Sequence, residues 1–221
     1  GGCTSVPVVV TVGSKQSVPV TATVTAQQTS CTTPNGSASA LVSGSVAGYT
    51  FKWFRGNNTL AANLIGSASS VTGLAAGVYT VEATNIVTGC VDTEVVTVND
   101  VIVIPTVTAS VTNQLTQCSP LNGAVSATAS GAGTFTYYWF NGNIGTPDTL
   151  LANVKGAAYT ALNSGFYTVV AVNKATRCAS ARAVVQVLDN TVIPTISTTS
   201  VSQTSCNPAT PNGQASANVG G

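Results

Sequence analysis

Histidine and methionine are absent from the 221 residues, and charged side chains are few, with seven basic and six acidic residues. Histidine is the commonest general base and the commonest metal ligand, so its absence removes both at once. A net charge of +1 provides no field that would steer the chain toward nucleic acid or an anionic membrane. We therefore predict no enzymatic activity, no metal or other cofactor, and no nucleic-acid partner.

The residues that remain offer no alternative catalytic chemistry. The serines have no histidine to activate them. Asp92 and Glu94 share one face of a predicted strand, where carboxylates usually serve solubility. Asp100 and Asp189 each stand alone at a predicted junction between repeats, whereas calcium needs six to eight oxygen ligands with several carboxylates. The sequence predicts neither a catalytic site nor a calcium site.

Long hydrophobic runs are also missing. Val8–Val10 and Val101–Ile104 are among the longest, and a helix that spans a bilayer needs about 20 apolar residues. Cys3 follows two glycines, as a lipid-modified cysteine would, but its position in a repeat offers another explanation. We expect no membrane insertion of this segment.

The chain does contain a repeat with a period of 87 or 88 residues. One series of cysteines is Cys31, Cys118 and Cys206, and a second is Cys3, Cys90 and Cys178. Near each member of the first series lies an Asn-Gly pair between two alternating runs, at 35–36, 122–123 and 212–213. This pattern predicts tight hairpin turns with positive φ at both residues.

The repeat divides the chain into four parts: the last strand of a preceding repeat (1–13), two complete repeats (14–100 and 101–190), and the first hairpin of a following repeat (191–221). Neither end supplies the equivalent of 45–87, so the fragments could not complete one domain between neighbouring molecules. We interpret the chain as a section of a longer array. Alternating apolar and Thr/Ser residues predict the strands of the first unit at 18–27, 37–43, 49–55, 58–64, 68–72, 78–85 and 92–98, with the second unit offset by 87–88.

About seven short strands in a unit of this size predict an all-β fold of tandem immunoglobulin-like β-sandwich repeats, of the polycystic-kidney-disease or fibronectin type, in an extended array. Trp53 and Trp139 fall on the third strand, where such a sandwich buries a tryptophan. Tyr79 and Tyr167 each follow a glycine by two residues at the start of the sixth strand and are predicted to be tyrosine corners.

These motifs resemble the SprB-type repeat and related immunoglobulin-like modules of giant secreted surface proteins of Bacteroidota. The resemblance rests on Cys-x(3)-Asn-Gly-Ser-Ala-x-Ala, Tyr-x-Phe-x-Trp, Leu-x-Ala-Gly-x-Tyr-Thr-Val and a closing Asn-x(3)-Gly-Cys, all within 31–90. Residues 118–178 match with Arg177 in place of the closing glycine, and 206–217 match the opening alone. The resemblance implies secretion to the bacterial cell surface, often by the type IX route, and a role as adhesin, gliding-associated filament or spacer.

Six cysteines without histidine or a Cys-x-x-Cys pair favour disulfides over metal binding. Pairing Cys31 with Cys90 and Cys118 with Cys178 would give each repeat its own bond. An immunoglobulin-like topology opposes this, because its second and sixth strands run the same way and an eight-residue strand separates their poles by about 26 Å, while a disulfide tolerates a Cα separation of about 7 Å. Three pairings stay open: within repeats under another topology, Cys31 with Cys178 across the junction, or between chains.

We predict that the chain is the stalk or filament body of a long extracellular protein, with neighbouring repeats as its partners. One alternative is an adhesin that binds glycans or proteins through Tyr137, Tyr138 and Phe140, which flank Trp139. Another is a fibre in which identical chains associate laterally through uncharged sheet edges. Sequence patterns also mark three candidate glycosylation sites: Asn35, Asn57 and Thr149.

Overall fold

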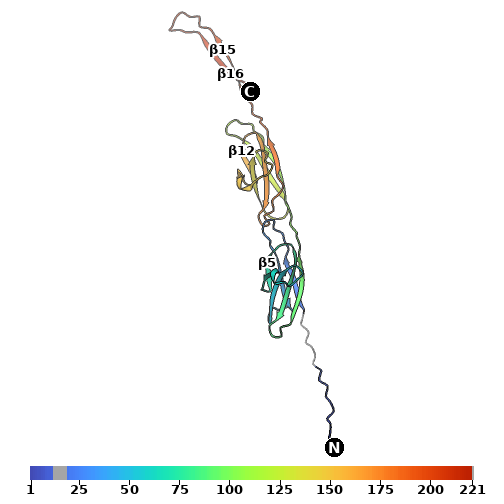
Figure 1. The fold of residues 1–221 in the computed structure, drawn as a ribbon. Coiled ribbons are helices and arrows are strands. Elements are labelled where there is room, and N and C mark those ends of the chain that lie inside the picture. The colour runs from blue at the N-terminus through green and yellow to red at the C-terminus, as the bar shows by residue number, and fades with distance from the viewer. Residues whose placement is uncertain (12–18, 221) are drawn as a thin grey trace. The chain divides into compact units, whose positions relative to one another are not determined.

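The computed structural model describes residues 1–11 and 19–220, which divide into two compact units, Gly1–Val103 and Ile104–Gly221. Strands and two short 3-10 helices form the regular structure of these residues (Figure 1). The all-β prediction is confirmed. The predicted start of the first repeat at 14 and of its first strand at 18 lies outside the described residues, and residues 1–11 form no strand.

The first unit contains two antiparallel sheets. One has the order β1-β2-β5 and the other the order β4-β3-β6-β7. Both contribute side chains to one buried apolar cluster, as in a β-sandwich. The elements are β1 (Val20–Ala26), β2 (Gly36–Val42), β3 (Tyr49–Arg55), η1 (Ala61–Asn63), β4 (Leu64–Gly66), β5 (Ser70–Leu74), β6 (Gly77–Asn85) and β7 (Val91–Val98).

The second unit repeats this arrangement. Its sheets have the orders β8-β9-β12 and β11-β10-β13-β14, so each strand has the same neighbours as its counterpart in the first unit. The elements are β8 (Thr106–Asn113), β9 (Gly123–Ser130), β10 (Phe135–Asn141), η2 (Thr149–Leu151), β11 (Val154–Lys155), β12 (Ala158–Leu162), β13 (Gly165–Asn173) and β14 (Ala183–Val187). β15 (Thr195–Val201) and β16 (Gln214–Gly220) then form a separate antiparallel hairpin, drawn at the red end of the colour scale in Figure 1.

Each sandwich is built around one tryptophan. Trp53 on β3 and Trp139 on β10 are both 0% exposed. The indole N–H of Trp53 donates to the Ala68 carbonyl at 3.1 Å, and that of Trp139 donates to the Gly156 carbonyl at 3.0 Å. The polar end of each indole is therefore satisfied inside the core, which removes the penalty of burying it.

The predicted fourth strand at 58–64 is wrong. The chain instead forms η1 and then the short strand β4, which pairs with β3. The Asn58 side-chain oxygen accepts hydrogen bonds from the Leu60 N–H at 3.1 Å and from the Asn63 amide at 2.8 Å. An asparagine that bonds nearby backbone in this way favours a turn over an extended strand.

The predicted Asn-Gly hairpin turns are also wrong. Residues 27–35 connect β1 to β2, and Gly36 is already the first residue of β2, without positive φ. A Cβ on Gly36 would lie 2.7 Å from the Leu74 carbonyl oxygen, and one on Gly123 would lie 2.5 Å from the Leu162 carbonyl oxygen. Glycine is needed here because the neighbouring strand passes so close to the backbone.

Candidate functional site

The six cysteines differ in their bonding. Cys31 and Cys178 are disulfide-bonded. The other four are free and exposed: Cys3, Cys90, Cys118 and Cys206. A bond within each repeat would use Cys90 and Cys118, so the within-repeat pairing is excluded in this structure.

The residues before each cysteine of the first series are held by an asparagine side chain. In the first unit the Asn35 side-chain oxygen accepts hydrogen bonds from the N–H groups of Thr29 and Ser30, at 2.9 and 3.3 Å. The Asn35 amide donates to the Thr29 hydroxyl at 2.8 Å. We call residues 29–35 the opening loop, since it precedes β2 and carries Cys31.

The same clamp recurs at both equivalent positions. Asn122 accepts from the N–H groups of Thr116 and Gln117 at 2.9 and 3.2 Å and donates to the Thr116 hydroxyl at 2.7 Å. In the β15–β16 hairpin Asn212 accepts from the N–H groups of Thr204 and Ser205, both at 3.0 Å, and donates to the Thr204 hydroxyl at 2.8 Å. The opening loop therefore has the same hydrogen bonds in all three copies, residues 29–35, 116–122 and 204–212.

Gln28, the residue just before the opening loop, is hydrogen-bonded to the segment that follows the last strand of its own unit. The Gln28 N–H donates to the Asn99 carbonyl at 3.0 Å, and the Val101 N–H donates to the Gln28 carbonyl at 2.9 Å, which makes a short parallel bridge. In the second unit Leu115 makes the same bridge beside Asp189. The cysteine of the opening loop therefore lies at the pole where the chain leaves the unit.

Asp100 and Asp189 stand at these chain exits. The Asp100 carboxylate accepts from the Ile102 N–H at 3.1 Å. The Asp189 carboxylate accepts from the N–H of Thr191 at 2.9 Å and from its hydroxyl at 2.7 Å, and these two bonds lower the pKa of Asp189. Among the described residues no three His, Cys, Asp or Glu side chains gather in a group that could hold a metal ion.

Two cysteines of the second series, Cys90 and Cys178, follow β6 and β13 in what we call the closing loop, residues 85–90 and 173–178. The Asn85 side-chain oxygen accepts from the N–H groups of Val87 and Thr88, both at 3.0 Å. The Asn85 N–H donates to the Cys90 carbonyl at 2.9 Å, and the Cys90 N–H donates to the Thr88 hydroxyl at 3.3 Å. These bonds fix the backbone on both sides of Cys90.

The second closing loop has the same hydrogen bonds. Asn173 accepts from the N–H groups of Ala175 and Thr176 at 2.9 and 3.1 Å, its own N–H donates to the Cys178 carbonyl at 2.9 Å, and the Cys178 N–H donates to the Thr176 hydroxyl at 3.4 Å. Residue 89 of the first loop is glycine with φ of 71°, and its counterpart Arg177 has φ of 61°. The arginine keeps a left-handed backbone that favours glycine.

The predicted corner tyrosines, Tyr79 and Tyr167, are part of the buried cores of their units. The Tyr79 hydroxyl donates to the Ala75 carbonyl and the Tyr167 hydroxyl to the Asn163 carbonyl, each at 2.8 Å, so each ties the start of its strand to the residue four positions earlier. Burial raises the pKa of Tyr167, and the nearby Tyr159 raises it further. These contacts serve packing and strand placement.

The aromatic residues of β10 do not form an exposed platform. Phe140, one of the three residues of the candidate glycan-binding cluster, is only 5% exposed. Its cross-strand partner Thr168 donates its hydroxyl to the Gly142 carbonyl at 2.7 Å and accepts from the Ile144 N–H at 2.9 Å, so the loop after β10 is held against this face. The half-buried Tyr138 ring has the Lys155 ammonium 5.3 Å from its centroid.

Tyr137 is also engaged by the fold, because its hydroxyl accepts from the Ala129 N–H at 3.1 Å. The candidate glycosylation residues Asn35 and Asn57 are both exposed, but the Asn35 amide is occupied by a hydrogen bond of the opening-loop clamp. Thr149 begins η2, a turn in which the Asp148 carboxylate accepts from the Leu150 N–H at 2.9 Å.

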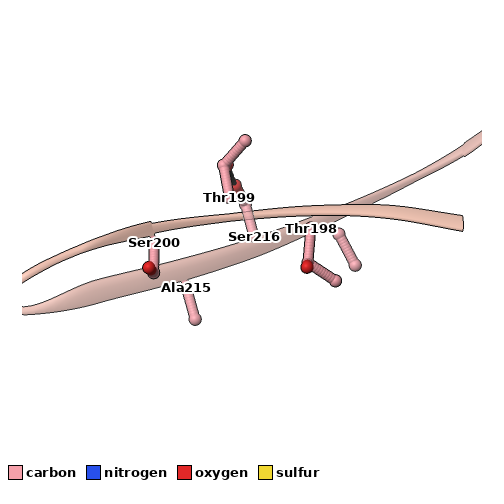
Figure 2. Close-up of a pocket in the computed structure, with 6 residues that line it drawn as sticks. Thr198, Thr199, Ser200, Ala215 and Ser216 are labelled. Carbon is pink, nitrogen blue, oxygen red and sulfur yellow. Dashed lines mark hydrogen bonds between the residues drawn. The ribbon is translucent and has the colours of Figure 1, made fainter.

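The β15–β16 hairpin has a shallow hollow of about 410 Å³. It is lined by Thr198, Thr199, Ser200, Ala215, Ser216 and Ala217. Figure 2 shows Thr198 and Ala215 projecting from one side of the hairpin and Thr199 from the other. In the first unit the counterparts of Ala215 and Ala217 are Ala38 and Ala40, which are 0% and 1% exposed because strands of both sheets pack around them. The hollow therefore lies on the face that corresponds to a packed face of the first unit.

Within the described ranges 1–11 and 19–220, no helix is long and apolar enough to cross a membrane. The threonine and asparagine clamps around the cysteines were not foreseen from the sequence, although Thr29 and Asn35 recur six residues apart at 116 and 122 and would have signalled them. No protein-family model matches the chain, and no curated protein is similar enough to count as a relative.

Proposed function

We propose that the chain is a structural repeat segment, the stalk or filament body of a long extracellular cell-surface protein, built from tandem immunoglobulin-like sandwiches of the SprB-type. The two units support this proposal because their strand orders are the same, with β4 and β11 placed beside the third strand as in fibronectin-like domains. Their opening and closing loops also share their hydrogen bonds. Repeated domains of one structure are better suited to extend a protein than to bind a single ligand.

The observation that carries the proposal is which two cysteines are disulfide-bonded. Cys31 lies on the opening loop of one repeat and Cys178 on the closing loop of the next, and the other four cysteines are free. We propose that these two bond to each other and thereby join consecutive repeats covalently. A disulfide also fits an extracellular location, since thiols stay reduced in the cytosol.

Electron microscopy of the purified chain tests the stalk proposal. We expect separate particles of single-chain width, each with two small domains. A thick fibre with a lateral periodicity would contradict it and would favour the assembly of identical chains side by side. A charge added to an exposed edge strand, as in Val95→Lys, would disrupt a fibre whose chains pair through their sheet edges. If the chain is a stalk, its edges do not pair, and the variant should give the same single-chain particles.

Glycan binding is the function that the structure supports less. Tyr137 and Phe140 are engaged in the fold, which leaves Tyr138 of the candidate cluster, and the Lys155 ammonium lies 5.3 Å from the centroid of its ring. A glycan array with the whole chain and with Tyr138→Ala would decide this alternative. Selective binding that disappears in the variant would replace the stalk proposal with an adhesin.

A further inference from the structure

We propose that a hollow at the edge of the second unit binds the anionic group of an acidic polysaccharide, and that Lys155 and Lys174 hold this group. The hollow has a volume of about 280 Å³ and is lined by Phe135, Thr136, Tyr137, Lys155, Lys174 and residues 156–157. The inference goes beyond the proposed function, because it places a ligand on one repeat of a chain whose repetition serves length. It depends neither on the stalk role nor on the pairing of the cysteines.

The hollow lies where β10 extends past its short partner strand, since β11 contributes only two residues to the pairing. Lys155 is the last residue of β11, and the N–H of the next residue, Gly156, donates to the Tyr137 carbonyl at 3.1 Å. Lys174 follows β13, and its own N–H donates to the Thr134 carbonyl at 2.9 Å. Both lysines therefore extend from backbone that is hydrogen-bonded to β10 or to the residue before it, which fixes where the two side chains start.

The two ammonium groups of the hollow have no carboxylate to neutralise them. In the part of the chain that the structure describes, the one ion pair joins Lys52 and Glu82 of the first unit. Residues 104–221 contain four basic side chains and two acidic ones, and the acidic residues, Asp148 and Asp189, do not line the hollow. Two cations that share a hollow repel each other, and an anion bound between them turns that repulsion into attraction. The charges therefore indicate an anionic ligand.

The first unit has uncharged residues at both positions. Ser67 corresponds to Lys155, because each precedes the residue whose carbonyl accepts the N–H of the buried tryptophan. Ile86 corresponds to Lys174, because the N–H of each donates to a carbonyl of the residue just before the third strand of its unit. The Ile86 side chain is 65% exposed, so the fold does not need a lysine there. The pair of lysines belongs to one repeat and is not required by the architecture that both repeats share.

The rest of the lining favours a sugar acid over other anions. A free inorganic anion stays hydrated and gains little from two exposed ammonium groups. A sugar ring that carries a carboxylate or a sulfate also packs its C–H groups against aromatic side chains, and Phe135 and Tyr137 line the same hollow. The volume lies near the lower end for small-molecule sites, which suits one sugar ring of a polymer. The small net charge of the chain disfavours nucleic acid, whose binding depends on many phosphate contacts.

The test measures binding of the whole chain to polygalacturonate, which carries carboxylates, and to dextran sulfate, with uncharged dextran as the neutral comparison. By isothermal titration calorimetry we expect binding to at least one of the acidic polymers and none to dextran, and we expect that binding to weaken as salt is added. Lys155→Gln and Lys174→Gln should each weaken the binding by about fivefold, the effect of one solvent-exposed charge pair. The double variant should bind more weakly than either single variant. Binding to neither acidic polymer, or binding that is unchanged in the double variant, would overturn the inference.

The matched control is the double variant Arg177→Gln with Arg182→Gln, which removes the same charge from the same unit outside the hollow and should leave binding nearly unchanged. An equal loss in this control would overturn the inference, because the overall charge of the unit would then attract the polymer. Tyr138→Ala should also keep the binding, since Tyr138 does not line the hollow, and this result separates the site from the adhesin alternative. Inorganic sulfate or monomeric galacturonate that displaces the polymer at the same concentration of anionic groups would overturn the assignment to a polysaccharide. Circular dichroism of each variant checks that the β-structure is retained, and none of these results bears on the particle width by which the stalk proposal is judged.

Discussion

The two units have the same loops but opposite cysteine states. In the first unit the opening-loop cysteine is bonded and the closing-loop cysteine is free, while in the second unit the closing-loop cysteine is bonded and the opening-loop cysteine is free. The asparagine and threonine hydrogen bonds are nevertheless the same in both states. The loops thus keep the same hydrogen bonds with and without a disulfide, and we expect the side-chain clamps to determine their shape.

The largest expected effect is the loss of stability in one unit when its buried tryptophan is removed. Trp53→Ala should destabilise the first unit by about 3–5 kcal/mol, since it removes a fully buried side chain and its hydrogen bond. Trp139, the remaining tryptophan, then reports the second unit in a urea titration followed by fluorescence, while circular dichroism follows both units.

We expect the Trp139 transition to move by much less than the first-unit transition. The reciprocal variant Trp139→Ala is the control, with Trp53 as the reporter of the intact unit. Equal shifts of both transitions in either variant would show that the units unfold as one, and would remove the basis for comparing them separately.

The next effect compares a bonded cysteine with its free counterpart. Cys31→Ser should lower the stability of the chain by about 2–4 kcal/mol, because it removes the constraint that the disulfide places on the unfolded chain. The matched variant Cys118→Ser should be nearly neutral, as Cys118 is exposed and free. Thermal unfolding with and without reducing agent measures both; reducing agent should erase the difference between Cys31→Ser and the unsubstituted chain.

A smaller effect tests the claim that the clamps shape the loops. Asn35→Ala removes three hydrogen bonds and leaves two backbone N–H groups of the opening loop without their partner, which should cost about 1–3 kcal/mol. Asn122→Ala should cost a similar amount in the second unit, where the cysteine is free. Hydrogen exchange at residues 29–30 and 116–117 gives the local readout. Protection that survives in both variants would show that the clamps do not hold these loops.

How much the sequence predicted depends on the range of the interactions involved. Alternating apolar residues indicated most of the strands, because the side-chain period of a strand is local and β2 buries every second residue from Gly36 to Ala40. The Asn-Gly pair was wrongly predicted to form a hairpin turn, because the same two residues also suit a side-chain clamp followed by a strand. The clamp needs Thr29, six residues away, and the glycine is dictated by Leu74 on another strand.

The cysteines show the limit of local patterns more clearly. Three pairings were consistent with the spacing of Cys31, Cys90 and Cys178, and the structure removed the within-repeat choice by showing Cys90 free. The exposure of the aromatic residues on β10 was also overestimated. Whether Phe140 is exposed depends on the loop held by Thr168, which lies 28 residues further along the chain.

The smallest effect concerns one backbone position of the closing loop. Gly89→Ala should destabilise the first unit by about 1 kcal/mol, because a side chain is strained at φ of 71°. Arg177→Gly should relieve the same strain in the second unit, but glycine also gains entropy in the unfolded chain, so we expect a change of about 0.5 kcal/mol or less. Urea titrations of the two variants measure these values, and a loss of stability of several kcal/mol for Arg177→Gly would indicate that the arginine side chain makes contacts that the backbone argument omits.

The central claim is that a bond between Cys31 and Cys178 joins consecutive repeats. Proteolysis of the oxidised chain without reduction, followed by mass spectrometry of the linked peptides, tests it most directly. The proposed function predicts one linked pair, Cys31 with Cys178, and four alkylated thiols at Cys3, Cys90, Cys118 and Cys206. A Cys31–Cys90 or Cys118–Cys178 peptide would contradict it.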